Sequence, residues 1–323
     1  MAAGNMQNEQ HGQPANSGGS IASDARWLAA GAAGLVAAIL ALWAFRGLPG
    51  GSLALWISAT PLFLAGMGFG TTALIAAIGV ASLALLLAGN SLMLGLFLAA
   101  FAAPVLALVL ASGGDPRRGV TAQLTLPFAL LGVIPALGIG VAAFMLADQQ
   151  GGLEGAMRQA ADMALAKLGL PAGEAMIADL VRVKAAAIGF WVMLALLLNA
   201  AAAGSALTRL GILATAPAWR EARLPAWYLA LPALAALGWF AADEGADAVP
   251  LSIMLALLVP VFLHGLAAFH RVTRALRGRP MVLGGAYAAL LVIAVPMALA
   301  ATGFGLFDIV NAKRGRHAPP PQT

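Results

Sequence analysis

Four histidines are the first residues to consider for chemistry, because imidazole is a common metal ligand and general base. His11 and His317 lie near the two ends of the chain, whereas His264 and His270 belong to one apolar segment. A metal-binding pair on one helix face needs i, i+4 spacing. His264 and His270 are six residues apart, with no acidic residue nearby in the sequence. We therefore predict a packing hydrogen bond for His264, an interfacial position for His270, and no metal site.

Other motifs of catalysis or cofactor binding are missing from the chain. It has no cysteine, which excludes disulfides, thiolate metal sites and cysteine nucleophiles. It also lacks the G-x-S-x-G, P-loop and dinucleotide-binding motifs. The glycine-rich stretch from Gly66 to Gly70 indicates a turn or close helix packing. We predict that the protein is not an enzyme and binds no cofactor.

Polar side chains within apolar segments remain as candidates for a binding site. Thr60 precedes Pro61, and Asn199 and Tyr287 lie in two later apolar segments. With His264, these side chains could line a cavity between helices. Alternatively, each makes a hydrogen bond between helices. His264 is the only ionisable residue inside the predicted spans, which argues against a proton pump, a voltage sensor or a carboxylate-dependent antiporter.

The densest group of charges, here called the arginine cluster, consists of Arg271, Arg274, Arg277 and Arg279. One interpretation is that it meets anionic lipid headgroups, at about 1 kcal/mol per charge. The alternative is that it docks a cytoplasmic partner. The chain has 18 Lys and Arg against 13 Asp and Glu. In a membrane protein such an excess indicates orientation, so no nucleic-acid partner is predicted.

The composition of the chain decides which elements must position these residues. Of 323 residues, 61% are hydrophobic and 10% charged, and the mean hydropathy is +0.90. Soluble domains contain about 25% charged residues, so we predict an all-α polytopic helical membrane protein in contact with the lipid bilayer. A helical span needs about 20 apolar residues. About nine are expected: Trp27–Phe45, Leu53–Met67, Thr71–Ala88, Leu92–Ala111, Leu124–Leu146, Ala185–Leu207, Ala226–Ala242, Val249–Phe269 and Met281–Thr302.

The limits of the membrane domain follow from the same pattern. The short second segment, which contains Pro61, could instead be re-entrant, leaving eight spans. Residues 1–25 and 311–323 are predicted to be disordered tails around a helical domain of residues 26–310. Residues 148–184 are predicted to be an amphipathic extracytoplasmic segment, with Gly169 ending one helix and Pro171 beginning another. This segment is either a lid or a pair of helices on the bilayer surface.

The charges between the predicted spans orient the chain. Cytoplasmic loops carry an excess of Lys and Arg. The loops with Arg209, Arg223 and the arginine cluster are therefore expected inside, and the acidic loop of residues 243–247 outside. The two ends fit less well, because nine spans place Arg46 and the basic residues of 313–316 outside.

Four stretches carry a resemblance to a known family, and they are spread over residues 28–316. They are Pro61–Gly70, Leu224–Trp227, His264–Arg274 and Gly305–Asp308. In these the chain resembles the YybS-like family of bacterial inner-membrane proteins, which carry a domain of unknown function. The resemblance carries over no site residue. The general plan is similar to the substrate-binding subunits of energy-coupling-factor vitamin transporters. That similarity implies a small solute and a cytoplasmic ATPase module, or another membrane subunit, as partner.

Two functions agree with these observations. The first is a transport-related, multi-pass protein of the bacterial inner membrane that binds a small solute between its helices. The alternative is a membrane scaffold or regulatory protein that docks a partner through its basic cytoplasmic loops. A cavity near Thr60, Asn199 and Tyr287 would favour the first, and a sealed apolar bundle the second.

Overall fold

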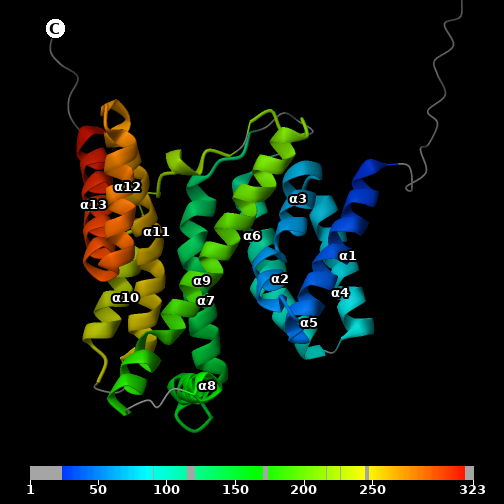
Figure 1. The fold of residues 1–323 in the computed structure, drawn as a ribbon, viewed down its shortest axis with the longest axis horizontal. Helices are drawn as coiled ribbons and strands as arrows, with labels where there is room; N and C mark the ends of the chain where they lie inside the picture. Colours follow the sequence, from blue (N-terminus) through cyan, green and yellow to red (C-terminus); the bar gives the residue numbers. More distant parts are fainter. Residues whose placement is uncertain are drawn as a thin grey trace, which may run out of the picture.

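A computed structural model of the chain describes residues 24–89, 91–114, 121–169, 174–215, 217–225, 227–243 and 247–316. Its regular elements are all helical over these ranges, which confirms the predicted fold class (Figure 1). The helices are α1 Ala25–Phe45, α2 Gly51–Ile57, α3 Thr60–Phe69, α4 Thr71–Ala88, α5 Ser91–Phe97, the π-helical turn η2 Leu98–Ala102, α6 Ala103–Ser112, α7 Thr125–Met145, α8 Gly152–Leu168, α9 Glu174–Arg209, α10 Ala230–Phe240, α11 Ala248–Val272, α12 Arg279–Val292 and α13 Ala294–Arg316.

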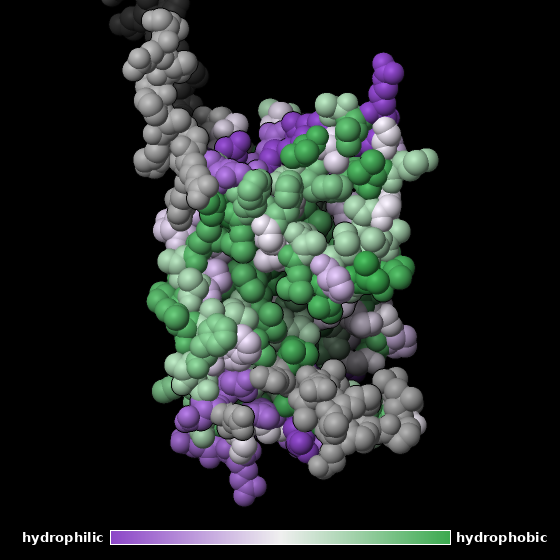
Figure 2. Space-filling model, turned by 90° about the vertical axis from the view of Figure 1, so that its left-hand side faces the viewer, coloured by the Kyte–Doolittle hydropathy of each residue, from purple (hydrophilic) through white to green (hydrophobic). Residues whose placement is uncertain are grey.

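The surface of the bundle is that of a multi-pass membrane protein. Figure 2 shows a hydrophobic belt between two hydrophilic ends. Large apolar side chains in the belt are strongly exposed, among them Leu87, Phe144 and Leu291 at 78%, 84% and 85%. Such a surface is stable only in lipid. Within the described residues, eight helical segments are long and apolar enough to cross a membrane, and α10 and α12 are shorter.

Small residues bring α1 and α4 into close contact. Ala37, Ala41, Ala77 and Ala81 are completely buried between the two helices, and a Cβ added at Gly34 would collide with the Ala77 carbonyl. Small side chains let membrane helices approach closely. Dispersion contacts then stabilise the pair, because the hydrophobic effect does not drive association between helices in lipid. The N-terminal helices therefore form a tight layer that can support the neighbouring interrupted helix.

The second predicted span is an interrupted helix that crosses the bundle, so the re-entrant alternative for it is wrong (Figure 1). α2 ends at Ile57 and α3 begins at Thr60. The proline ring at position 61 has no N–H to donate to the preceding turn. Ser58 and Ala59 connect the two helical parts, and Pro61 fits the first turn of α3. The break leaves backbone groups that another helix must satisfy.

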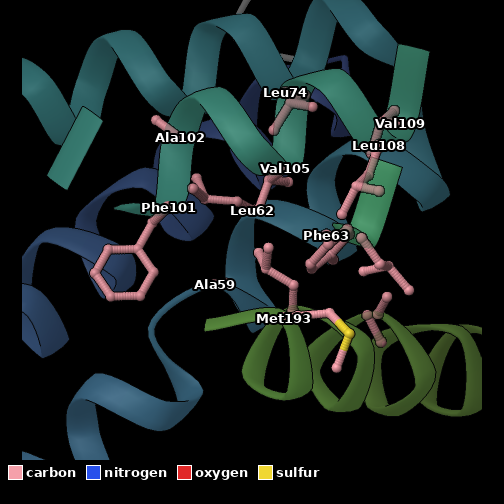
Figure 3. Close-up of a cluster of buried hydrophobic side chains, with 14 of the residues drawn as sticks. Ala59, Leu62, Phe63, Leu74, Phe101, Ala102, Val105, Leu108, Val109 and Met193 are labelled. Atoms are coloured by element: carbon pink, nitrogen blue, oxygen red, sulfur yellow. The ribbon is translucent and has the colours of Figure 1, made fainter. Parts of the chain in front are cut away.

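The N-terminal and C-terminal halves meet where α3, which packs against α6, also packs against α9. Figure 3 shows this cluster, in which Leu62 and Phe63 of α3 lie with Val105 of α6 and Met193 of α9. All four side chains are at most 2% exposed. On the same side of the break, Gly68 lets α3 approach Leu207 closely. The contact is dense and apolar, so it closes the space between the halves.

The extramembrane segment was predicted only in part. α8 is a separate helix that ends at Gly169, whose φ of +66° suits glycine. Pro171 lies outside the described residues. α9 continues without interruption to Arg209 over 36 residues, and its candidate span begins at Val183, close to the predicted start at Ala185. Long helices of this kind join a surface segment rigidly to the membrane bundle.

The last predicted span, Met281–Thr302, is wrong. α12 ends at Val292, and α13 begins at Ala294 and returns beside it, so that the two form a hairpin (Figure 1). Gly265 is packed against Ala301. With a rise of 1.5 Å per residue, α13 begins about 15 Å short of the level of Ala248, where α11 begins. The hairpin is therefore a re-entrant element.

The hairpin changes the predicted topology. α1 begins and α13 ends at the same end of the bundle (Figure 1). This end also carries Arg209, Arg223 and the arginine cluster, and is called the basic end below. α13 continues to Arg316, past the predicted domain limit at residue 310. The basic segment of 313–316 thus agrees with the positive-inside rule, which the nine-span prediction violated.

Arg46 lies at the opposite end, against the positive-inside rule, and its contact explains its position. Its guanidinium Nη2 donates a hydrogen bond of 2.7 Å to the Ala88 carbonyl in the last turn of α4. Basic side chains near a helix C-terminus satisfy free carbonyls and interact favourably with the helix dipole. Arg46 therefore has a local structural role that opposes its orienting effect.

Candidate functional site

A cavity of about 620 Å³ lies between the two halves of the bundle. Its walls come from the end of α1, from α2, from α5 and η2, and from the middle of α9. The lining residues are Phe45, Leu55, Trp56, Ala59, Leu96, Ala100, Phe101, Ile188, Trp191, Val192, Ala195 and Leu196. Ligand sites in proteins measure about 300–1,000 Å³ and are mostly apolar and aromatic. The cavity therefore has the size and the lining of a small-molecule site.

Two tryptophans from opposite walls meet at this cavity. The rings of Trp56 and Trp191 are 5.3 Å apart between centroids, at an interplanar angle of 85°. This edge-to-face arrangement is the favourable one for aromatic rings. Trp191 also contacts Phe190 and keeps 53% of its surface exposed. An aromatic or apolar ligand can therefore stack on these rings.

The polar residues predicted as cavity-lining lie beside the cavity and bind each other. The Thr60 hydroxyl donates to the Asn199 side-chain carbonyl. The Asn199 amide donates two hydrogen bonds of 2.6 Å to the carbonyls of Trp56 and Ala195. The Trp56 carbonyl belongs to the broken turn between α2 and α3, so the Asn199 amide repairs the break. Thr60 and Asn199 thus form the helix–helix hydrogen bond named as their alternative role.

The π-helical turn η2 shapes the opposite wall. Ala100 and Phe101 belong to this turn and line the cavity. A π-turn carries one extra residue per turn and is frequent at functional sites. Toward the basic end, the Leu62, Phe63 and Met193 cluster closes the space (Figure 3). The cavity is therefore confined to the half of the bundle farther from the basic end.

His264 lies elsewhere, in a charge cluster between α11 and α13. Its Nε2 is 2.9 Å from the Asp308 carboxylate, and the Arg271 guanidinium donates to the same oxygen at 2.8 Å. The His264 side chain is only 3% exposed, against 36% for Asp308. Gly265 and Gly305 bring the two helices into backbone contact beside this cluster.

The expectation that His264 has no acidic partner is wrong. Asp308 was missed because the predicted last span ended at Thr302, which left Asp308 outside the predicted spans. It belongs to α13, within the apolar segment Ala294–Ala312. The argument against proton-coupled mechanisms assumed no acidic residue in the spans, and that premise no longer holds.

The remaining predicted residues lie at the basic end. His270 and Tyr287 are hydrogen-bonded at 2.8 Å. Arg274 forms an exposed ion pair with Glu221 at 3.2 Å. Tyr287 lines a smaller apolar groove between α11, α12 and α13. The four predicted cavity residues thus lie in three places. Thr60 is with Asn199, His264 is with Asp308, and Tyr287 lies in the apolar groove. Among the described residues, no group of three His, Asp or Glu is placed to hold a metal ion.

Comparisons with known proteins identify no relative. No family model, no curated protein and no solved structure matches the chain. The resemblance to the YybS-like family stays a prediction, and so does the similarity to vitamin-transporter subunits.

Proposed function

We propose that the protein is a transport-related protein of a bacterial inner membrane and binds a small apolar or aromatic solute in the cavity between α2, η2 and α9. The observation that carries the proposal is the cavity of about 620 Å³ beside an interrupted helix. Interrupted helices near the middle of the bilayer form the binding sites of many transporters. Together with a π-turn in the opposite wall, this arrangement supports a ligand site.

The chemistry of the lining selects the class of solute. Both N–H groups of the Asn199 amide and the Thr60 hydroxyl are used within the protein. The side chains that line the cavity are apolar except for the indole N–H groups of Trp56 and Trp191. A strongly polar solute would lose its hydrogen bonds to water without replacement. The site therefore favours a flat aromatic or aliphatic molecule with few polar groups.

The position of the cavity suggests the direction of access. The positive-inside rule places the basic end in the cytoplasm, and the apolar cluster around Phe63 and Met193 lies between that end and the cavity. Solute would then enter from outside or from the outer leaflet. A cytoplasmic ATPase module or another membrane subunit, as the resemblance implies, would act from the basic end.

The test uses the full chain in lipid nanodiscs and measures thermal unfolding with a panel of aromatic and vitamin-like solutes. A ligand at 100 times its dissociation constant stabilises the folded state by about 2.7 kcal/mol, a shift of several degrees in midpoint. Ala195→Phe fills the cavity and should abolish the shift. Trp227→Phe, at an exposed tryptophan away from the cavity, should leave it unchanged. If no solute stabilises the wild type, or the shift survives in Ala195→Phe, the proposal is wrong.

The alternative of a scaffold that docks a partner through the arginine cluster has less support. Arg271 and Arg274 are already paired with Asp308 and Glu221. Of the four arginines, Arg277 and Arg279 are the two that form no ion pair with a described residue and could bind another molecule. Crosslinking with mass spectrometry distinguishes the two functions, because a scaffold loses its captured partner when the arginines are replaced by glutamine.

A further inference from the structure

The groove between α11, α12 and α13 is a second hollow, separate from the proposed solute cavity. It measures about 190 Å³. A dry cavity of about 150 Å³ accommodates benzene, so the groove has room for part of a hydrocarbon chain. Its lining is apolar except for Tyr287: Gly265, Leu266, Phe269, Ala286, Leu290, Met297, Ala300, Ala301 and Phe304.

The basic end of this groove carries cations that nothing in the described structure neutralises. Arg277 lies in the connection from α11 to α12, and Arg279 is the first residue of α12. Neither forms an ion pair with any residue that the structure describes. The Nε of Arg279 is buried without a hydrogen-bond partner. A buried donor without a partner is costly, so the Arg279 side chain would be stabilised by turning toward an acceptor at the surface.

Helix geometry aligns Arg279 with the groove. Ala286, Tyr287 and Leu290 line the groove from α12, and they follow Arg279 by seven, eight and eleven residues. These spacings repeat one face of an α-helix. Arg279 is therefore on the groove-lining face, about 10 Å above the first lining residue at 1.5 Å per residue. Tyr287, on the same face, is hydrogen-bonded to His270 of α11.

We propose that this groove is a binding site for an anionic phospholipid. One acyl chain lies between α11, α12 and α13, and the phosphate is bound by Arg279 and Arg277 at the cytoplasmic surface. Charge complementarity selects the occupant, because basic pockets between helices on that side bind anionic lipid headgroups. Figure 2 shows the corresponding face, with a hydrophobic belt below hydrophilic residues at the upper end. The lipid would cover the re-entrant hairpin, whose helix α12 has no buried residue.

The experiment compares two lipids with identical chains, phosphatidylglycerol and phosphatidylcholine, by native mass spectrometry of the full chain. The wild type should retain phosphatidylglycerol preferentially. Each cation next to the bound headgroup contributes about fivefold to affinity for anionic lipid, so Arg277→Gln with Arg279→Gln should weaken retention about thirtyfold. Ala286→Phe fills the groove and should also displace the lipid. The matched control, Arg209→Gln, removes one charge from the same end and should change retention less than about twofold.

Equal retention of the two lipids by the wild type would overturn the proposal, because the headgroup would then not be recognised. So would equal losses in Arg209→Gln and Arg279→Gln, which would indicate a general surface effect. Helical circular dichroism shows whether each variant is folded. If the double variant is not, Arg279→Gln alone and the salt dependence of the wild-type preference decide, since phosphate binding weakens in high salt.

Discussion

The hydrogen bonds of Asn199 allow a quantitative prediction about the interrupted helix. In Asn199→Leu the side chain keeps its approximate volume but loses its amide. The Trp56 carbonyl then has no donor, whereas the Ala195 carbonyl keeps its helical partner. The Thr60 hydroxyl loses its acceptor but can turn to the Trp56 carbonyl of the preceding turn. This rearrangement recovers part of the loss.

The expected magnitude follows from these contacts. An unsatisfied buried group costs about 1–3 kcal/mol, and hydrogen bonds between membrane helices contribute about 0.6 kcal/mol on average, up to about 1.7. With partial recovery by Thr60, Asn199→Leu should lower the free energy of unfolding by about 1–2 kcal/mol. Combined with Thr60→Val, the loss should be smaller than the sum of the two single losses, because both substitutions remove the same Thr60–Asn199 hydrogen bond.

The assay is reversible unfolding in mixed micelles, followed by tryptophan fluorescence. Thr208→Val is the matched control, because the Thr208 hydroxyl binds only the Gly204 carbonyl of its own helix. It should change the free energy of unfolding by less than about 0.5 kcal/mol. The reasoning is refuted if Asn199→Leu costs no more than this control, or if the losses at Asn199 and Thr60 are simply additive.

Two further predictions concern the re-entrant hairpin. Gly265→Ala places a Cβ against a carbonyl of α13 and should lower the free energy of unfolding by about 1–3 kcal/mol. Gly303→Ala, in open space on α13, should be neutral or stabilising by up to about 1 kcal/mol; similar losses in both would contradict the close contact. Because the chain has no cysteine, Leu276→Cys, Ala312→Cys and Gln149→Cys each introduce a unique thiol. Impermeant maleimides should label positions 276 and 312 from one side of the membrane and position 149 from the other. If positions 312 and 149 were labelled from the same side, the chain would have a full ninth span.

Spans were predicted well where the sequence contains residues that begin or end helices. The predicted span Thr71–Ala88 has the bounds of α4, because Gly70 and Gly89 flank it as caps. α1 begins at Ala25, where Asp24 accepts a hydrogen bond from the Arg26 amide as an N-cap. Glycine and capping residues work in a membrane as they do in water, so local chemistry was sufficient there.

The last predicted span shows why hydropathy alone is insufficient. Hydropathy reports whether a side chain tolerates lipid, and it does not report whether the backbone turns. The sequence from Leu290 to Val295 is continuously apolar and contains no polar turn residue. One signal was present, because Pro296 is typical of a first helical turn and falls in the first turn of α13. As a residue of a first helical turn, Pro296 predicts the helix start that the structure shows at Ala294.

The candidate site was predicted by residue type but not by arrangement. Thr60 and Asn199 were selected because neutral polar groups are rare in apolar segments, and they do meet, although 139 residues separate them. No spacing rule could have paired them. The tryptophans of the cavity, Trp56 and Trp191, were not singled out, because an aromatic residue in an apolar helix is ordinary. Only the tertiary contact between α2 and α9 makes them a pair.

The pairing of Asp308 also has a consequence for biogenesis. A carboxylate at the centre of a nascent membrane helix opposes insertion by about 2.5–3.5 kcal/mol, and Asp308, four residues before the end of the apolar segment Ala294–Ala312, incurs part of that cost. α13 therefore inserts poorly by itself, but α11, synthesised earlier, offers Arg271 and His264 to receive the charge. Because α11 is synthesised first, Arg271 and His264 are present before Asp308 enters the membrane. Integration of the C-terminal hairpin becomes a folding event that is guided by α11, in addition to partitioning into lipid.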